Sequence, residues 1–180
     1  MIGSPPHSPP GDPIDAAVGK IVHRLFEYAL PIDDELAGRA ESLAGELTGR
    51  TPQQRRQTAQ SAAELYRALM ERTELQNLLN TSTGQIFREV PFSLRRRGQI
   101  LRGAIDSLLL LDRRVVVIDY KTGGHRPEHR LQIELYLEAA RELFPAHDVE
   151  GVVFYARGKP LRIASAARNA AESGSQMELF

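Results

Sequence analysis

The stretch VVVIDYK (residues 115–121) decides the fold of this 180-residue chain. Its first four residues are β-branched, which is typical of a strand that is buried on both faces of a sheet. The glycine pair at residues 123–124 follows and breaks the strand. Because alternate residues of a strand point to the same face, the sequence predicts that Asp119 and Lys121 share one side of the sheet.

A second acidic residue, Asp106, interrupts the apolar run LRGAIDSLLLL at residues 101–111. A buried carboxylate without a partner is destabilising, so Asp106 and Asp119 both require a cation or several hydrogen bonds. If these two strands form a hairpin, the two carboxylates meet across the ladder. Two carboxylates with Lys121 would suit a divalent cation that activates water against a phosphodiester. The alternative is that an aspartate and a lysine before a glycine pair are ordinary turn residues.

Outward from this stretch, the apolar spacing predicts helices before it and a mixed pattern around it. The expected helices are residues 14–30, 35–47, 52–70 and 74–79. The expected strands are residues 86–94, 99–111, 115–120 and 149–156. A further helix is expected at residues 127–144, with Leu131, Leu135, Ala139 and Leu143 on its inner face.

This order predicts an α/β fold with a central mixed sheet of about four strands, flanked by helices, and an additional N-terminal helical portion. We expect one folded domain at residues 14–163, with a helical part at 14–80 and the core sheet and helix at 85–157. The Pro-rich residues 1–13 are expected to be a disordered lead, and the small polar residues from 164 onward a flexible tail.

The composition limits the chemistry that the chain can support. It has 23 Lys and Arg against 23 Asp and Glu, which argues against a uniformly basic nucleic-acid binder but leaves room for a local basic patch. It has no cysteine, so it offers no disulfide, no ligand for an Fe–S cluster and no thiolate for zinc. Oxygen and imidazole ligands favour Mg²⁺ or Mn²⁺. No run is long enough to span a membrane, and the N-terminus has no apolar signal core, so we expect a cytoplasmic protein.

Five short motifs occur in an order that resembles the PD-(D/E)XK nuclease superfamily, in particular the RecB/AddA-type nuclease domain of bacterial helicase-nucleases. The motifs are G-x-x-x-H-x-x-x-E at residues 19–27, EVPF at 89–92, GAID at 103–106, VIDYKTG at 117–123 and Q-x-x-x-Y at 132–136. The resemblance spans residues 15–157. It implies a restriction-endonuclease-like core and a Mg²⁺- or Mn²⁺-dependent deoxyribonuclease of DNA repair and recombination, an exonuclease rather than an endonuclease. The absence of cysteines matches the branch of the family without an Fe–S cluster.

The resemblance also implies roles for individual residues. Asp106, Asp119, His23 and the main-chain carbonyl of Tyr120 would hold the metal, and Lys121 would be the catalytic lysine. Without the resemblance, His23 is a histidine satisfied in the core.

Three further residues have expected roles near the metal. Gln132 and Tyr136, one helical turn apart, would position DNA or the nucleophile; alone they are the polar edge of an amphipathic helix. Glu89 would bind metal or water, or only order its strand. Glu27 would orient the His23 ring, or lie on the surface.

Basic side chains follow the second aspartate. His125, Arg126, His129 and Arg130 are expected to contact the phosphate backbone of DNA, although a charge run is more often a solvated face.

The chain ends in QMELF, residues 176–180. The peptide resembles the bacterial sliding-clamp-binding motif Q-L-x-L-F, and Gln176, Met177, Leu179 and Phe180 would be its anchors. The alternative is a frayed end.

The sequence therefore predicts a metal-dependent DNA nuclease whose partners are DNA, a sliding clamp, and a helicase or parent polypeptide, with no membrane partner. One alternative is a DNA- or clamp-binding module of the same fold that does not cleave. Another is a structural protein with a polar turn in its sheet.

Overall fold

The computed structural model describes residues 13–47, 51–96 and 98–164. The predicted lead at residues 1–12 and the clamp-like peptide at 176–180 lie outside these residues. The elements are α1 (Pro13–Glu27), α2 (Leu36–Leu47), α3 (Pro52–Met70), α4 (Thr73–Leu79), β1 (Gln85–Arg96), β2 (Gln99–Leu110), β3 (Arg114–Lys121), α5 (Pro127–Leu143), β4 (Asp148–Tyr155) and β5 (Leu161–Ile163). The predicted order of helices followed by β-β-β-α-β is confirmed.

A five-stranded mixed sheet forms the centre, in the order β1-β2-β3-β4-β5. β1, β2 and β3 are antiparallel neighbours, β3 and β4 are parallel, and β4 and β5 are antiparallel. The prediction of about four strands missed β5. This strand has only three residues, which is too short to show the alternation of apolar and polar residues that marks a strand in the sequence.

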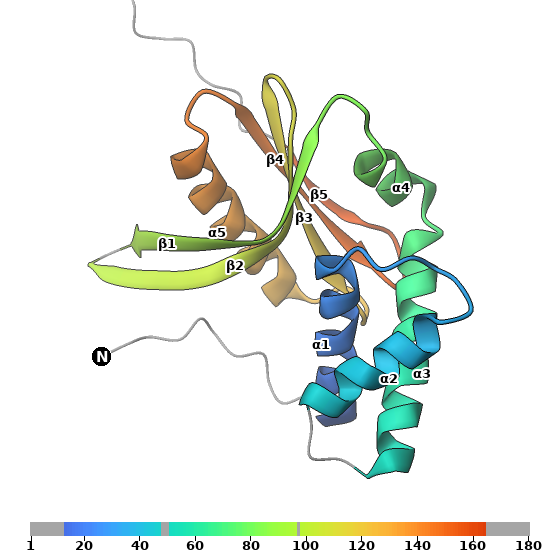
Figure 1. The fold of residues 1–180 in the computed structure, drawn as a ribbon. Helices are drawn as coiled ribbons and strands as arrows, with labels where there is room; N and C mark the ends of the chain where they lie inside the picture. Colours follow the sequence, from blue (N-terminus) through green and yellow to red (C-terminus); the bar gives the residue numbers. More distant parts are fainter. Residues whose placement is uncertain (1–12, 48–50, 97, 165–180) are drawn as a thin grey trace, which may run out of the picture.

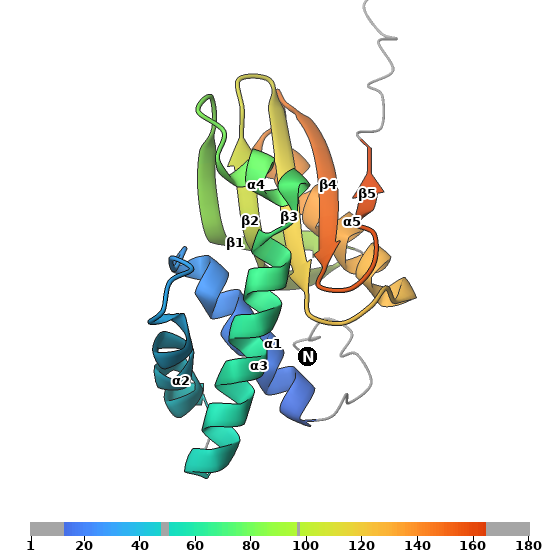
Figure 2. The ribbon, with the colours of Figure 1, turned by 90° about the vertical axis from the view of Figure 1, so that its right-hand side faces the viewer.

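Helices cover both faces of the sheet, as Figures 1 and 2 show: α1 to α4 lie on one face and α5 on the other. The core on the first face includes Leu25, Tyr66 and Phe154, and the core on the second includes Ile133 and Tyr155. Residues 115–118 of β3 are no more than 1% exposed, so the prediction that this strand is buried on both faces is confirmed.

The start of α3 follows its predicted signals. Thr51 is the N-cap and Pro52 occupies the first turn. The Thr51 hydroxyl accepts a hydrogen bond from the Gln54 N–H at 3.3 Å, and the Gln54 side-chain oxygen accepts one from the Thr51 N–H at 3.0 Å. This reciprocal pair satisfies two backbone donors that would otherwise lack partners.

The inner face of α5 differs from the prediction. Leu131 is 63% exposed and Leu143 is 50% exposed, while Ala139 is buried as expected. The side chains that contact the sheet include Ile133 and Leu137. They pack over Gly151 of β4, where an added Cβ would lie 2.9 Å from Ile133 and 3.1 Å from Leu137. The close approach that this glycine permits selects one of two apolar stripes on α5, and the sequence of the helix alone does not specify which.

The β1–β2 hairpin leaves the sheet at Asp106. β2 pairs with β3 only from Ser107 to Leu110, whereas it pairs with β1 along its whole length. In Figure 1 the free part of the hairpin extends away from β3 as a two-stranded arm. The register, with Ser107 opposite Ile118, sets Asp106 beside Asp119 where the pairing ends. The two aspartates therefore lie where β2 and β3 separate. Within the described residues, no helix is long and apolar enough to cross a membrane.

Candidate functional site

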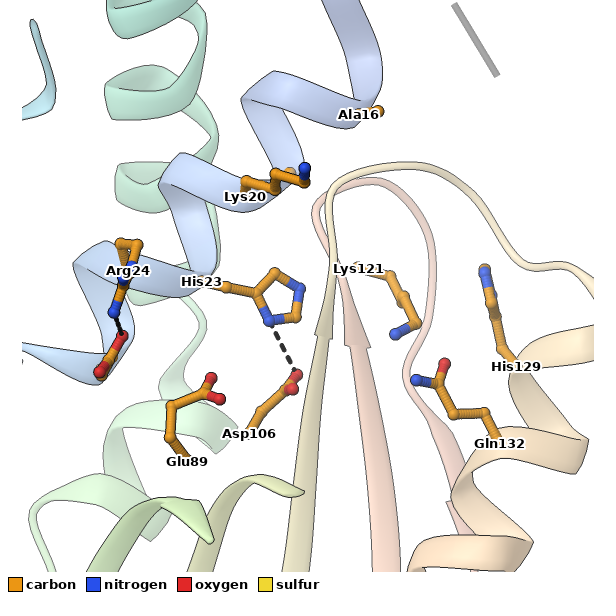
Figure 3. A pocket seen from close by; sticks show the side chains of 11 residues that line it. Ala16, Lys20, His23, Arg24, Glu89, Asp106, Lys121, His129 and Gln132 are labelled. Atoms are coloured by element: carbon orange, nitrogen blue, oxygen red, sulfur yellow. Dashed lines mark hydrogen bonds and ion pairs between the residues drawn. The ribbon is translucent and has the colours of Figure 1, made fainter. Parts of the chain in front are cut away.

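A pocket of about 770 Å³ opens where β2 separates from β3. Helix α1 forms one wall, α5 forms the opposite wall, and strands β1, β2 and β3 form the floor between them (Figure 3). The lining residues are Ala16, Gly19, Lys20, His23, Arg24, Glu27, Glu89, Asp106, Lys121, His129 and Gln132. Four residues predicted to act at the active site, His23, Asp106, Lys121 and Gln132, are therefore in one pocket.

His23 and Asp106 form the contact between the helical portion and the sheet. His23 Nδ1 lies 3.3 Å from Asp106 Oδ2, and the Tyr120 N–H donates a hydrogen bond to the same oxygen at 3.1 Å. The Tyr120 ring stacks on Phe26, with centroids 3.7 Å apart and planes within 4°. Its hydroxyl donates to Ser107 Oγ at 3.1 Å. Tyr120 therefore fixes both α1, which carries His23, and β2, which carries Asp106.

The pair is polarised by its own charges. Burial disfavours a charged His23, but the adjacent Asp106 carboxylate outweighs burial and raises the pKa of His23. Burial likewise disfavours the Asp106 carboxylate, but the charge of His23, their hydrogen bond and Lys121 together lower the pKa of Asp106. His23 thus lies in the pocket beside an acid and does not belong to the apolar core.

Asp119 and Lys121 lie on the same face, as the strand alternation predicted. Lys121 Nζ donates to Asp119 Oδ1 at 2.8 Å. The second oxygen, Asp119 Oδ2, is buried and has no hydrogen-bond partner among the described residues. Burial, together with the charge of Asp106, raises the pKa of Asp119 from 3.8 to about 6. A buried oxygen without a donor is the kind of atom that a cation would satisfy.

Three other groups have the spacing of metal ligands. One ligand atom each from His23, Glu89 and Asp106 lies within 4.8 Å of the others. Two oxygens and an imidazole nitrogen suit Mg²⁺ or Mn²⁺. Asp119 is outside this group because Lys121 holds one of its oxygens. The orphaned Asp119 oxygen and this group together fit a divalent cation.

Glu89 has an unusual backbone for a strand residue. Its φ is +49°, in the left-handed region that disfavours residues with a Cβ. It lies between Arg88 and Val90, which pair with Ser107 and Ile105, and so it faces Asp106. Burial, followed by the charge of Asp106, raises the pKa of Glu89. A strained backbone beside two candidate ligands suggests that the fold holds this carboxylate in place for a purpose.

Helix α5 contributes Gln132 and Tyr136 one turn apart. Gln132 Nε2 donates to the Tyr136 hydroxyl at 2.7 Å, and only Gln132 lines the pocket. Tyr136 is 8% exposed and packs edge-on against Phe92 of β1 at 5.7 Å. Burial, followed by the charges of Asp106 and Asp119, raises the pKa of Tyr136. The tyrosine is thus a neutral group that fixes the Gln132 amide.

The four basic residues after β3 have different surroundings. His129 lines the pocket, and its Nδ1 lies 3.3 Å from the Tyr155 hydroxyl. Burial and the nearby Lys121 lower the pKa of His129 to about 4, so it is uncharged near pH 7. His125, Arg126 and Arg130 are exposed and do not line the pocket, and Arg130 pairs with Glu134 at 2.9 Å.

Two features of α1 differ from the sequence-based expectation. Glu27 pairs with Arg24 at 2.7 Å, whereas the partner of His23 is Asp106. The expectation that Glu27 orients the His23 ring is therefore wrong in this structure. Lys20 lines the pocket and had no predicted role. Its position three residues before His23, on the same helical face, was the signal that could have found it.

Comparisons with known proteins agree with this architecture. The model of the PD-(D/E)XK nuclease superfamily matches residues 3–178, and the chain belongs to this superfamily. The predicted resemblance is confirmed.

Two relatives are described as the first of the subunits of an ATP-dependent helicase/nuclease. The protein from Streptococcus equi subsp. zooepidemicus is 27% identical over 158 residues, and that from Streptococcus sanguinis is 26% identical over 161 residues. The matches cover 81% and 82% of this chain but only 13% of each relative. The chain therefore spans a small part of the length of these relatives.

A solved structure shares the fold. The candidate exonuclease from Eubacterium rectale superposes with a TM-score of 0.51 at 12% identity, and the match covers 90% of this chain and 62% of that chain. At this identity the likeness supports the fold alone.

Proposed function

We propose that this chain hydrolyses phosphodiester bonds in DNA with Mg²⁺ or Mn²⁺, in DNA repair or recombination. The observation that carries the proposal is the buried Asp119 oxygen without a partner among the described residues, next to Lys121 and close to Asp106. Membership of a nuclease superfamily supports it, as do relatives described as helicase/nuclease subunits.

The candidate ligands are Asp106, Asp119, His23, Glu89 and the main-chain carbonyl of Tyr120. When bound, the cation would supply the positive charge that makes water acidic and neutralises a phosphate. Tyr120 holds Asp106 in orientation through its N–H.

Lys121 is the group best placed to act on the attacking water. Its ammonium lies 2.8 Å from Asp119 and lines the pocket, so it can steady a hydroxide or a phosphate oxygen there. On the opposite wall, the bond from Gln132 to Tyr136 keeps one amide directed at the pocket. These two groups would orient the nucleophile and the strand.

A DNA- or clamp-binding module that does not cleave is the alternative. Its weakness lies in Asp119, whose raised pKa means that the buried charge is destabilising at neutral pH. A module that only binds would be more stable with a neutral residue of the same shape. The retained acid therefore favours catalysis.

We further propose that the domain acts as an exonuclease beside a helicase, either in a longer polypeptide or as a partner. The relatives are described as helicase/nuclease subunits, and this chain matches 13% of their length. His125, Arg126 and Arg130, exposed after β3, would meet the phosphates outside the pocket, and His129 would donate or accept hydrogen bonds as a neutral ring.

Digestion of end-labelled linear DNA and of circular DNA with Mg²⁺ or Mn²⁺ tests the proposal. Asp119→Ala should lower cleavage at least about 100-fold, whereas Asp34→Ala, an exposed acid outside the pocket, should not change it. Equal cleavage by Asp119→Ala and the wild type would show that the proposal is wrong. Nicking of circular DNA would overturn only the exonuclease preference.

The C-terminal peptide is a separate proposal that rests on the sequence. We propose that Gln176, Met177, Leu179 and Phe180 bind a sliding clamp, because an extended peptide with a few apolar anchors suits such a surface. In a pull-down with purified clamp, deletion of residues 176–180 should abolish capture while leaving DNA cleavage intact. Unchanged capture would end this proposal.

A further inference from the structure

One face of helix α1 lines the pocket along its length. The residues on this face are spaced by three and four positions: Ala16, Gly19, Lys20, His23, Arg24 and Glu27. Eleven residue steps of an α-helix extend about 16 Å. Because His23, the partner of Asp106, lies in the middle, the wall continues past the acids in both directions.

The two halves of this wall differ in size and charge. Toward the start of α1 the residues are Ala16, Gly19 and Lys20, so two of three are small. A Cβ added at Gly19 would meet only Thr122 Oγ1, at 3.7 Å, and the helix therefore lies close to the end of β3. Toward the end of α1, the Arg24 charge is neutralised by Glu27.

Lys20 is a positive charge without a partner. Within residues 13–47, 51–96 and 98–164 it makes no hydrogen bond or ion pair, and it is exposed. Figure 3 shows its side chain beside the pocket, above His23 and across from Lys121. Lys121 is paired with Asp119, so its charge is already compensated. The ammonium of Lys20 is thus available to an anionic ligand.

We propose that Lys20 binds the backbone phosphate adjacent to the one that is cleaved, and that the strand follows the small residues Ala16 and Gly19 along α1. This inference rests on the proposed function. Lys20 is one helical turn from His23, about 4.5 Å along the axis, a distance of the same order as the ~3.4 Å between successive phosphates of a strand along a DNA axis. A flexible lysine acts as a point charge and tolerates any base sequence.

The charge of the opposite half gives the track a direction. Glu27 is there, and the carboxylate of Glu89 faces the same pocket. Phosphates would be repelled on that side unless a cation intervened. The strand therefore extends from the acids toward the start of α1.

Binding without cleavage tests the proposal directly. The affinity of a fluorescent oligonucleotide is measured in EDTA, over a range of salt concentrations. Lys20→Ala should weaken binding several-fold and reduce the salt slope by about 0.7–0.9, the value for one phosphate contact. Lys20→Arg should retain most of the affinity. Lys159→Ala, an exposed lysine that does not line the pocket, is the matched control and should bind as the wild type does.

The scarcity of lysine allows a second measurement. The chain has three lysines, Lys20, Lys121 and Lys159, so acetylation of each can be followed by mass spectrometry. DNA should protect Lys20 and leave Lys159 unchanged. Unaltered affinity of Lys20→Ala, or no protection of Lys20, would overturn the inference. If the wild type cleaves but Lys20 is not involved, only this inference fails; if Lys20 binds DNA but nothing is cleaved, only the proposed function fails; no binding by the wild type would overturn both.

Discussion

His23 Nδ1 lies 3.3 Å from Asp106 Oδ2, and the same carboxylate oxygen accepts the Tyr120 N–H at 3.1 Å. Three elements, α1, β2 and β3, thus meet at one oxygen atom. The stack of Phe26 on Tyr120 supports this meeting from the core. The helical portion is therefore part of the candidate site, because without α1 the Asp106 carboxylate would lose one of its two hydrogen-bonding partners.

The pH dependence of stability is the first prediction. The raised pKa of His23 means that its contribution is complete below about 6.5 and is lost as the pH rises through the raised value. The raised pKa of Asp119, about 6, has the same sign: its contribution is complete below 3.8 and is lost as the pH rises through 6. Asp106, with a lowered pKa, acts in the opposite direction only in acid. In EDTA, the free energy of unfolding should fall between pH 5.5 and 8.5.

Urea denaturation at the two pH values measures this fall. His23→Gln cannot titrate, so its loss of stability over the same interval should be smaller. A wild type that is as stable at pH 8.5 as at pH 5.5 would contradict the assignment.

Removal of the buried charge at position 119 is the second prediction. A pKa raised by about two units corresponds to about 3 kcal/mol at neutral pH, and loss of the Lys121 ion pair offsets part of this. Asp119→Asn should therefore unfold with a free energy about 1–2 kcal/mol higher than the wild type in EDTA at pH 7.5, while cleavage is lost. Asp34→Asn, on the surface, should change neither quantity. A destabilised Asp119→Asn would show that the carboxylate is better satisfied than its surroundings indicate.

The sequence predicted those parts of the site that depend on local geometry. Asp119 and Lys121 share a face because strand residues alternate, and this needs only two neighbouring positions. The contact of His23 with Asp106 joins residues far apart in the chain, and only the resemblance to a family brought them together. The partner predicted for His23 was wrong for this reason: Glu27 is a near neighbour, but the fold supplied a better one.

Tertiary packing decided what the sequence left open. The apolar stripe of α5 is selected by Gly151, which belongs to another element. The left-handed backbone at Glu89 occurs in a segment whose residues are otherwise typical of a strand. Propensity is a property of one segment, and these two features depend on what that segment meets.

The close approach at Gly151 gives the third prediction. A Cβ there would lie 2.9 Å from Ile133 and 3.1 Å from Leu137, so α5 would have to move. Gly151→Ala should lower the free energy of unfolding by about 1–3 kcal/mol. Gly38→Ala in α2, where a Cβ meets nothing within 4 Å, is the matched control and should raise it by about 0.5–1 kcal/mol. A neutral Gly151→Ala would mean that the sheet and α5 have room between them.

The backbone of Glu89 gives the last prediction, which separates strain from ligation. At a φ of +49° a Cβ is unfavourable, so Glu89→Gly should be more stable than Glu89→Ala by about 0.5–1 kcal/mol, even though glycine ordinarily destabilises a strand. Chemical denaturation of the two variants measures this difference, and a Glu89→Ala that is equally or more stable would remove the strain from the account. Mn²⁺ titration by calorimetry then addresses the carboxylate: Glu89→Gln, which keeps the shape and the backbone, should bind the ion at least about 10-fold more weakly than the wild type. Undiminished binding would leave Glu89 as a residue that only orders its strand, and the metal to His23, Asp106 and Asp119.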